Sequence, residues 1–133
     1  AGERMEVALL TQDQEDEHSC FSDNTHTDIR MNALGVENVY LGRYVTSAGV
    51  TIEGASIKEV VALVNSALAE EVATAITSAK DLCYTIPAPF DQQIANNDPG
   101  AHVETAVAAL KAAGDQVSAA AAALGLTIST DVE

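Results

Sequence analysis

The chain has 133 residues, the length of one domain with a single modest core. It carries 20 acidic and 6 basic residues, a net charge of −14, which excludes nucleic acid and anionic membrane surfaces as favoured partners because both need a Lys/Arg-rich surface. Aromatic residues are only 4% of the chain and no apolar run approaches the ~20 residues of a membrane span, so we expect closely packed helices and no transmembrane segment.

The first predicted element is a helix over residues 1–19, with one apolar face made by Met5, Ala8, Leu9 and Gln12. It opens with AGERMEVALL, which has no cap and no basic region followed by an apolar stretch. We therefore expect no signal peptide in this chain and interpret it as a piece of a longer protein. The stretch SCFSDN, residues 19–24, breaks the helical pattern with residues that often cap helices.

Two further helices are predicted in the middle of the chain. The first runs over residues 25–44, and the Gly- and Thr-rich segment 45–55 that follows is interpreted as a loop or a short extended piece. Ser56 and Glu59 then form a capping-box pattern, which predicts a helix over residues 56–83, about 40 Å long. Pro87 and Pro89 exclude its continuation.

The last predicted helix begins at Asp98 and Pro99, with Asp as the cap and Pro in the first turn, and ends at Gly125. Its apolar residues recur at spacings of three and four, which is typical of a helix that packs against other helices. In the preceding connection, Phe90 is interpreted as a core residue and Asp91 as a cap. About four amphipathic helices joined by short connections predict an all-α antiparallel bundle over residues 1–133.

Potential chemistry is concentrated in DQEDEHSCFSDNTHTD, residues 13–28. Glu15 and His18 are three residues apart and would share one side of a helix. If the chain reverses after them, carboxylates and imidazoles would converge in a donor set suited to iron, manganese or zinc. The candidate metal ligands are Glu15, His18, Asp23, His26 and Asp28. His18 oriented by Asp23 is an alternative general base.

A structural interpretation of the same residues stays open. The acidic residues would then be a solvated helix face, although negative charge near a helix carboxyl end is mildly unfavourable. Ser22, Asp23 and Asn24 would be caps. The sequence contains no phosphate-binding glycine loop, no HExxH zinc motif and no GxSxG nucleophile elbow.

Cys20 and Cys83 are the two cysteines of the chain, so a single intramolecular disulfide is possible. An exported protein would be expected to form this bridge, whereas a cytosolic one would keep two thiols.

The segment TQDQEDEHSCFSDNTHTD, followed by NALGVENVYLGRY at residues 32–44, resembles the imelysin-like family, and more narrowly its iron-regulated protein A branch. PAPFDQQI and AAALGL, residues 87–94 and 121–126, are also similar to that branch. The resemblance extends the motif to Glu17, Cys20, Ser22 and Asn24 beside the five candidate ligands. It favours a functional site over a capped turn.

This resemblance implies one half of a fold made of two helical bundles, here the C-terminal half. It further implies a bacterial periplasmic or outer-envelope location and metal binding, of iron or zinc as a divalent or ferric ion, in iron acquisition. The implied partners are the N-terminal half of the same fold or a second copy. The family's Gly-x-His-x-x-Glu peptidase motif is missing, since GAHVET at residues 100–105 has Glu one position too early. A metallopeptidase would therefore need the other half, and a purely structural half is the third interpretation.

Overall fold

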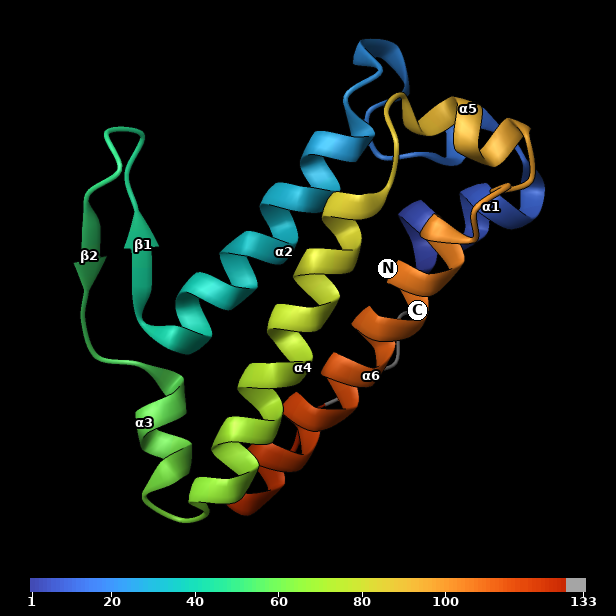
Figure 1. Cartoon of the computed structure of the whole chain (residues 1–133). Helices are drawn as coiled ribbons and strands as arrows, with labels where there is room; N and C mark the ends of the chain where they lie inside the picture. The colour runs from blue at the N-terminus through green and yellow to red at the C-terminus, as the bar shows by residue number, and fades with distance from the viewer. Residues whose placement is uncertain (129–133) are drawn as a thin grey trace.

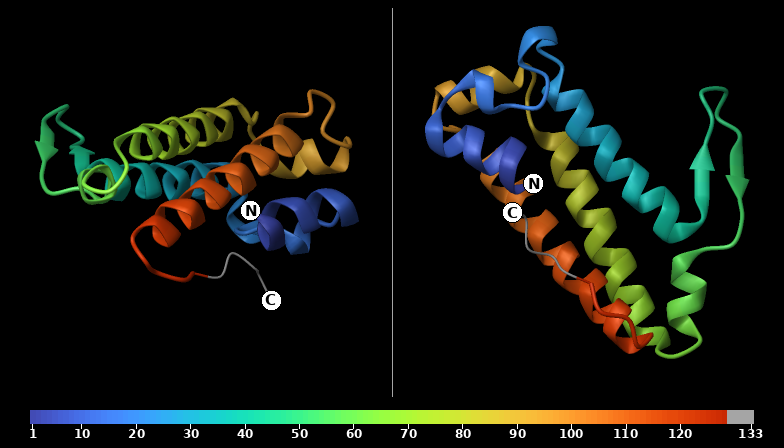
Figure 2. Two further views of the ribbon diagram at one scale, coloured as in Figure 1. Left: turned by 90° about the horizontal axis from the view of Figure 1, so that it is seen from below. Right: turned by 180° about the vertical axis from the view of Figure 1, so that it is seen from behind.

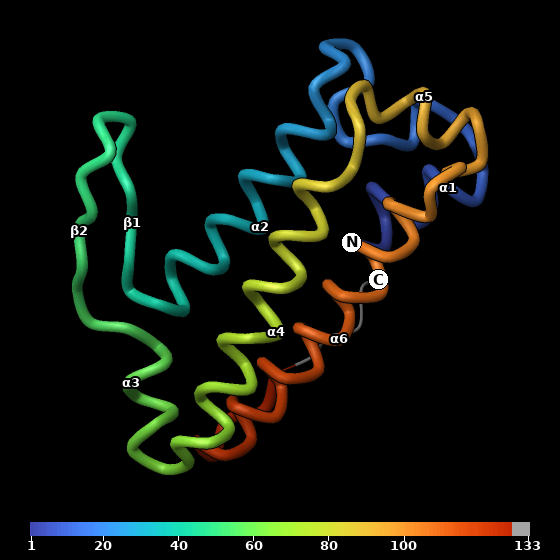
Figure 3. The backbone as a smooth tube through the Cα atoms, viewed as in Figure 1, coloured from blue at the N-terminus to red at the C-terminus, as the bar shows by residue number. Residues whose placement is uncertain are grey.

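Three long helices form the body of the protein in a computed structural model that describes residues 1–128. They are α2 (Thr25–Leu41), α4 (Ser66–Thr85) and α6 (His102–Ala123). The middle helix, α4, packs against both α2 and α6, and its direction is opposite to theirs (Figures 1 and 3). The predicted all-α antiparallel bundle is therefore confirmed as the fold class.

The N-terminal helix covers residues 2–11, made of a π-helical turn (Gly2–Glu6) and α1 (Val7–Thr11). It lies on the side of α2 and α6 away from α4 (Figure 2). The predicted continuation to residue 19 is wrong, because the chain turns left-handed at Gln12, where φ is 55°. Thr11 Oγ1 donates to Asp16 at 2.8 Å, and Asp13 accepts from the Glu15 N–H at 3.0 Å. These local bonds replace the helical ones.

A short antiparallel hairpin follows α2, and residues 45–55 contain both a turn and an extended piece; the helix predicted to reach residue 44 instead ends at Leu41, because the first strand begins at Arg43. Its strands are β1 (Arg43–Val45) and β2 (Thr51–Glu53), with Tyr44 opposite Ile52. Gly42 ends α2 at a φ of 63°, and a Cβ at this position would lie 2.5 Å from the Gly54 carbonyl oxygen. Glycine is therefore required for the turn from helix to hairpin.

The helix predicted over residues 56–83 is two helices, α3 (Ile57–Ala62) and α4. The capping box is present, since Ser56 Oγ accepts from the Glu59 N–H and the Glu59 carboxylate accepts from the Ser56 N–H, both at 3.0 Å. The chain then breaks at residues 63–65, and Asn65 caps α4 by accepting from the Leu68 N–H at 3.1 Å. The apolar pattern runs through this break without interruption, which is why periodicity alone missed it.

Between α4 and α6 the chain forms α5 (Phe90–Ala95), a helix that was not predicted. Phe90 is fully buried, as expected, but Asp91 makes no cap hydrogen bond and the N-cap residue is Pro89. Asp98 does cap α6, accepting from the N–H groups of His102 at 3.0 Å and Glu104 at 2.9 Å. The helix nevertheless begins at His102, so Pro99 is not in its first turn.

The core has two parts along the bundle. The part near α5 is centred on Phe90, Ile86 and Ile94, with Met5 and Ala8 from the N-terminal helix. The part at the opposite end is built from Tyr40, Val61, Val72 and small residues of α4 and α6. No helix within residues 1–128 is long and apolar enough to cross a membrane.

Candidate functional site

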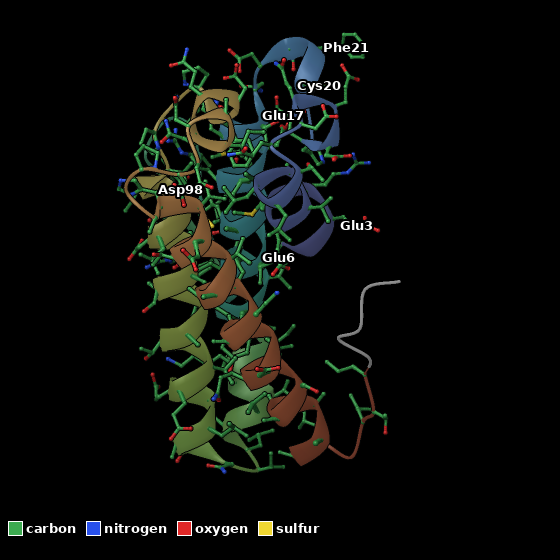
Figure 4. The ribbon with its side chains drawn as sticks, turned by 90° about the vertical axis from the view of Figure 1, so that its right-hand side faces the viewer. Glu3, Glu6, Glu17, Cys20, Phe21 and Asp98 are labelled. Atoms are coloured by element: carbon green, nitrogen blue, oxygen red, sulfur yellow. The ribbon has the colours of Figure 1, made fainter. Side chains whose placement is uncertain are left out.

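The predicted motif lies at one end of the bundle, in the junction segment, which we define as residues 12–24 between α1 and α2. It contains two short 3-10 turns, Gln14–Asp16 and Cys20–Ser22, and packs against α5. Figure 4 shows Glu17, Cys20 and Phe21 together at this end, and Phe21 is 98% exposed. Sequence-distant parts of the chain thus meet at the motif.

One part of the motif is a connected hydrogen-bond network. The Ser19 N–H donates to Thr25 Oγ1 at 2.9 Å, and the Ser19 hydroxyl donates to the Asp28 carboxylate. His18 Nδ1 lies 3.0 Å from the same carboxylate. The Ser19 hydrogen bond, together with the neighbouring His18, lowers the pKa of Asp28 below its ordinary value. These contacts fix the junction segment onto the first turn of α2.

Glu17 stands outside this network. Its side chain is 1% exposed, and neither carboxylate oxygen has a hydrogen-bond partner of good geometry within residues 1–128, although the side chains of Thr25 and Gln14 lie close enough to act on it. Burial raises the pKa of Glu17, and the nearby charges of Asp91 and Asp23 raise it further, while the side chains of Thr25 and Gln14 act in the opposite direction. Burying an ionised carboxylate without partners costs free energy of folding, and binding a proton, a cation or another hydrogen-bond donor would remove that cost.

Among the acidic and imidazole side chains of the described residues, two others share this lack of partners. Asp91 Oδ1, on the first turn of α5, and His26 Nδ1, on the first turn of α2, are both buried without a hydrogen-bond partner in the described chain. Arg30 holds this region together, since it donates to the Ile86 carbonyl at 2.6 Å and lies over the Tyr84 ring. That contact joins α2 to the connection that leads into α5.

The predicted ligands are only partly brought together. His18 and Asp28 are in direct contact, and the charge of His26 contributes to lowering the pKa of Asp28. Glu15 and Asp23 are exposed on the junction segment, as are Ser22 and Asn24. Within residues 1–128, no three His, Cys, Asp or Glu side chains converge tightly enough to hold a metal ion by themselves.

Sequence reasoning gave Glu17 no role of its own and misassigned Asp91. Glu17 is one of four acidic residues in a stretch of five, and it is the one that is buried, next to the turn Gln14–Asp16 that packs against α5. The sequence carries no pattern that predicts this burial, because the contact joins segments more than 70 positions apart.

Both cysteines are free thiols, so the possible Cys20–Cys83 disulfide is not formed in this structure. Cys20 is half-buried in the junction segment, whereas Cys83 is fully buried in the core on α4. Burial raises the pKa of the Cys83 thiol to about 11, which keeps it protonated and unreactive at neutral pH.

The fold and the motif together define a class: an acidic helical bundle with a partly unsatisfied polar centre at one end. The family model described as imelysin, peptidase M75, matches residues 1–117. The chain therefore belongs to the imelysin family. A comparison with curated proteins finds none that matches it.

Proposed function

We propose that this chain is the metal-binding part of an imelysin-family protein of the bacterial envelope, of the iron-regulated branch, and that it acts in iron acquisition. The observation that supports the proposal best is the Glu17 carboxylate, which is 1% exposed, lacks partners on both oxygens and lies near Asp91. A cation between these carboxylates would replace their mutual repulsion with attraction. The net charge of −14 further favours a cationic ligand.

The residues fit a metal ion in their chemistry and supply part of a coordination shell. Glu17 and Asp91 offer carboxylate oxygens and His26 a free imidazole nitrogen, which are donors suited to iron or zinc. His18 and Asp28 form a second donor pair beside them. Since no three of these side chains converge within the described residues, water or another part of the protein would complete the shell.

Titration of the metal-free protein with ferric citrate and with zinc tests this proposal. We expect saturable binding that Glu17→Gln weakens at least tenfold, because the amide keeps the shape and loses the charge. His18→Ala and His26→Ala distinguish the two donor pairs. Glu71→Gln, an exposed carboxylate on α4, is the matched control and should bind like the parent. Equal binding by all of these proteins would exclude the site.

A structural function for the junction segment is the second candidate, supported by the network of Ser19, Thr25, His18 and Asp28. These residues satisfy one another directly and need no ion. In this case Asp28→Asn would lower the thermal midpoint in the presence and absence of metal by the same amount.

Peptidase activity is a third candidate because the family description includes it. It requires groups beyond this chain, which lacks Gly-x-His-x-x-Glu. Proteolysis that a chelator abolishes in the longer protein, and that Glu17→Gln reduces, would support this role; no proteolysis would exclude it.

A further inference from the structure

The β-hairpin projects from the bundle and has one edge free. Figures 1 and 2 show β2 as its outermost strand, on the far side of β1 from α2. The sheet consists of these two strands, and no other strand within residues 1–128 pairs with β2. Both strands are exposed along their whole length. Because an isolated two-stranded hairpin is only marginally stable in water, a further strand at this edge would stabilise it.

The register of the hairpin determines which backbone groups lie at the free edge. The Gly54 N–H donates to the Gly42 carbonyl at 2.8 Å, so these residues are a hydrogen-bonded pair of the ladder. Hydrogen-bonded and non-hydrogen-bonded pairs alternate along antiparallel strands. Glu53, and Thr51 two positions earlier, therefore turn their N–H and carbonyl groups away from β1. The edge of β2 offers these donors and acceptors to another strand.

The two faces of the hairpin differ in chemistry. Tyr44 and Ile52 lie opposite each other on one face and are 53% and 56% exposed. Val50, two positions from Ile52 on the same face, is 57% exposed. The other face carries Arg43 opposite Glu53, a favourable pair of unlike charges. The apolar face lacks the cover that such side chains receive in a larger sheet, which marks it as a site of interaction.

The hairpin is electrically neutral although the chain is strongly acidic. Residues 44–52 carry no charge, and over residues 42–65 the basic Arg43 and Lys58 balance the acidic Glu53 and Glu59. The net charge of −14 therefore belongs to the rest of the chain. Since charges interact over about 8–10 Å at physiological salt, two copies of this protein repel each other less at the hairpin than at their acidic surfaces.

We propose that two copies of this chain associate through β2, antiparallel about a two-fold axis at Ile52, and form a four-stranded sheet. Thr51 of each copy then lies opposite Glu53 of the other, and their outward N–H and carbonyl groups hydrogen-bond across the axis. Such an interface is self-complementary, as a two-fold dimer requires.

The side chains agree with this register. Ile52 of one copy meets Ile52 of the other as a non-hydrogen-bonded pair, the closer kind, and a Tyr44 flanks each of them, so the apolar faces become one continuous row. The two Glu53 carboxylates stay apart, each between Arg43 of its own copy and Thr51 of the other. The hairpin lies at the opposite end of α2 from the junction segment, so this inference goes beyond metal binding and does not depend on it.

Disulfide crosslinking tests the register with two positions of matched exposure. Ile52→Cys places two thiols opposite each other at the axis, whereas Tyr44→Cys places them three strand spacings apart, or ~14 Å. Both are made together with Cys20→Ser, which removes the partly exposed native thiol. We expect Ile52→Cys to form the covalent dimer roughly tenfold faster than Tyr44→Cys under the same oxidant. Equal rates would overturn the proposal, and so would a faster reaction of Tyr44→Cys, which would assign the pairing to β1.

Sedimentation equilibrium of the unaltered chain measures the association itself. We expect a reversible monomer–dimer equilibrium that Ile52→Lys abolishes, because it sets two ammonium groups against each other at the axis. Val45→Lys, on β1 at a position that is 51% exposed, adds the same charge away from the axis and should leave the dimer unchanged. A dimer that Ile52→Lys does not weaken would overturn the proposal. A parent that stays monomeric up to about 1 mM would also overturn it and would leave the free edge to a strand of another protein.

Discussion

Glu17→Gln should stabilise the metal-free protein at neutral pH. The parent carboxylate is 1% exposed without partners, and the charges of Asp91 and Asp23 oppose its ionisation. Leaving a buried polar group unsatisfied costs about 1–3 kcal/mol, and a charge adds to that cost. Because glutamine keeps an unpaired amide, we expect a gain of about 1–2 kcal/mol, or a rise of about 3–10 °C in the thermal midpoint.

The gain should depend on pH in one direction. The pKa of Glu17 is raised in the folded state, so the unfolded chain loses this proton first as pH rises. The parent protein therefore loses stability over a pH window that begins at about 4.3, the ordinary pKa of Glu, and ends at the raised pKa of the folded state. Below that window both proteins carry a neutral side chain and their midpoints should agree.

Thermal unfolding of parent and variant in chelator-treated buffer, between pH 3.5 and 8, measures this effect. Glu71→Gln, on the exposed face of α4, serves as the control and should shift the midpoint little at any pH. A Glu17→Gln variant that is less stable than the parent at pH 7.5, or that differs from it equally at pH 3.5 and 7.5, would refute the assignment of Glu17 as a buried, uncompensated carboxylate.

Three further predictions follow from other parts of the structure. Asp28→Asn should lower the thermal midpoint at pH 7, because a carboxylate with a lowered pKa stabilises the fold while it is ionised. The loss of stability should shrink as pH falls below about 3.9, the ordinary pKa of Asp, and a loss that is independent of pH would contradict this reasoning. Iodoacetamide should label Cys20 and leave Cys83 unlabelled in the native protein, as mass spectrometry would show, and equal labelling would contradict the burial of Cys83. Asp98→Ala should destabilise the protein by about 1–2 kcal/mol in urea unfolding, since Asp98 caps two N–H groups of α6; an unchanged midpoint would show that water replaces it.

Periodicity and capping rules predicted the elements with strong local signals. The capping box at Ser56, the glycine stop at Gly125 and the long apolar seams of α2 and α6 are all present, but α2 ends at Leu41 rather than at residue 44, because the chain turns left-handed at Gly42. The all-α class followed from these features, because two long seams can be buried only against other helices.

The features that were missed depend on weaker or longer-range interactions. Gln12 carries no stop signal, yet local bonds from Thr11 and Asp13 end the first helix there. Asn65 caps α4 inside an apolar pattern that otherwise continues. The candidate site in the junction segment follows from its dense polar residues, but Glu17 is buried beside the contact with α5, a helix that the sequence did not predict.

Anomalous diffraction from crystals soaked in zinc or ferric citrate tests the proposed metal site most directly. We predict an anomalous peak about 2.0–2.2 Å from a carboxylate oxygen of Glu17, with Asp91 or His26 facing the same ion, and no such peak in Glu17→Gln crystals. Ordered water hydrogen-bonded to both oxygens of Glu17 in the soaked crystals, with no anomalous peak, would contradict the proposed site.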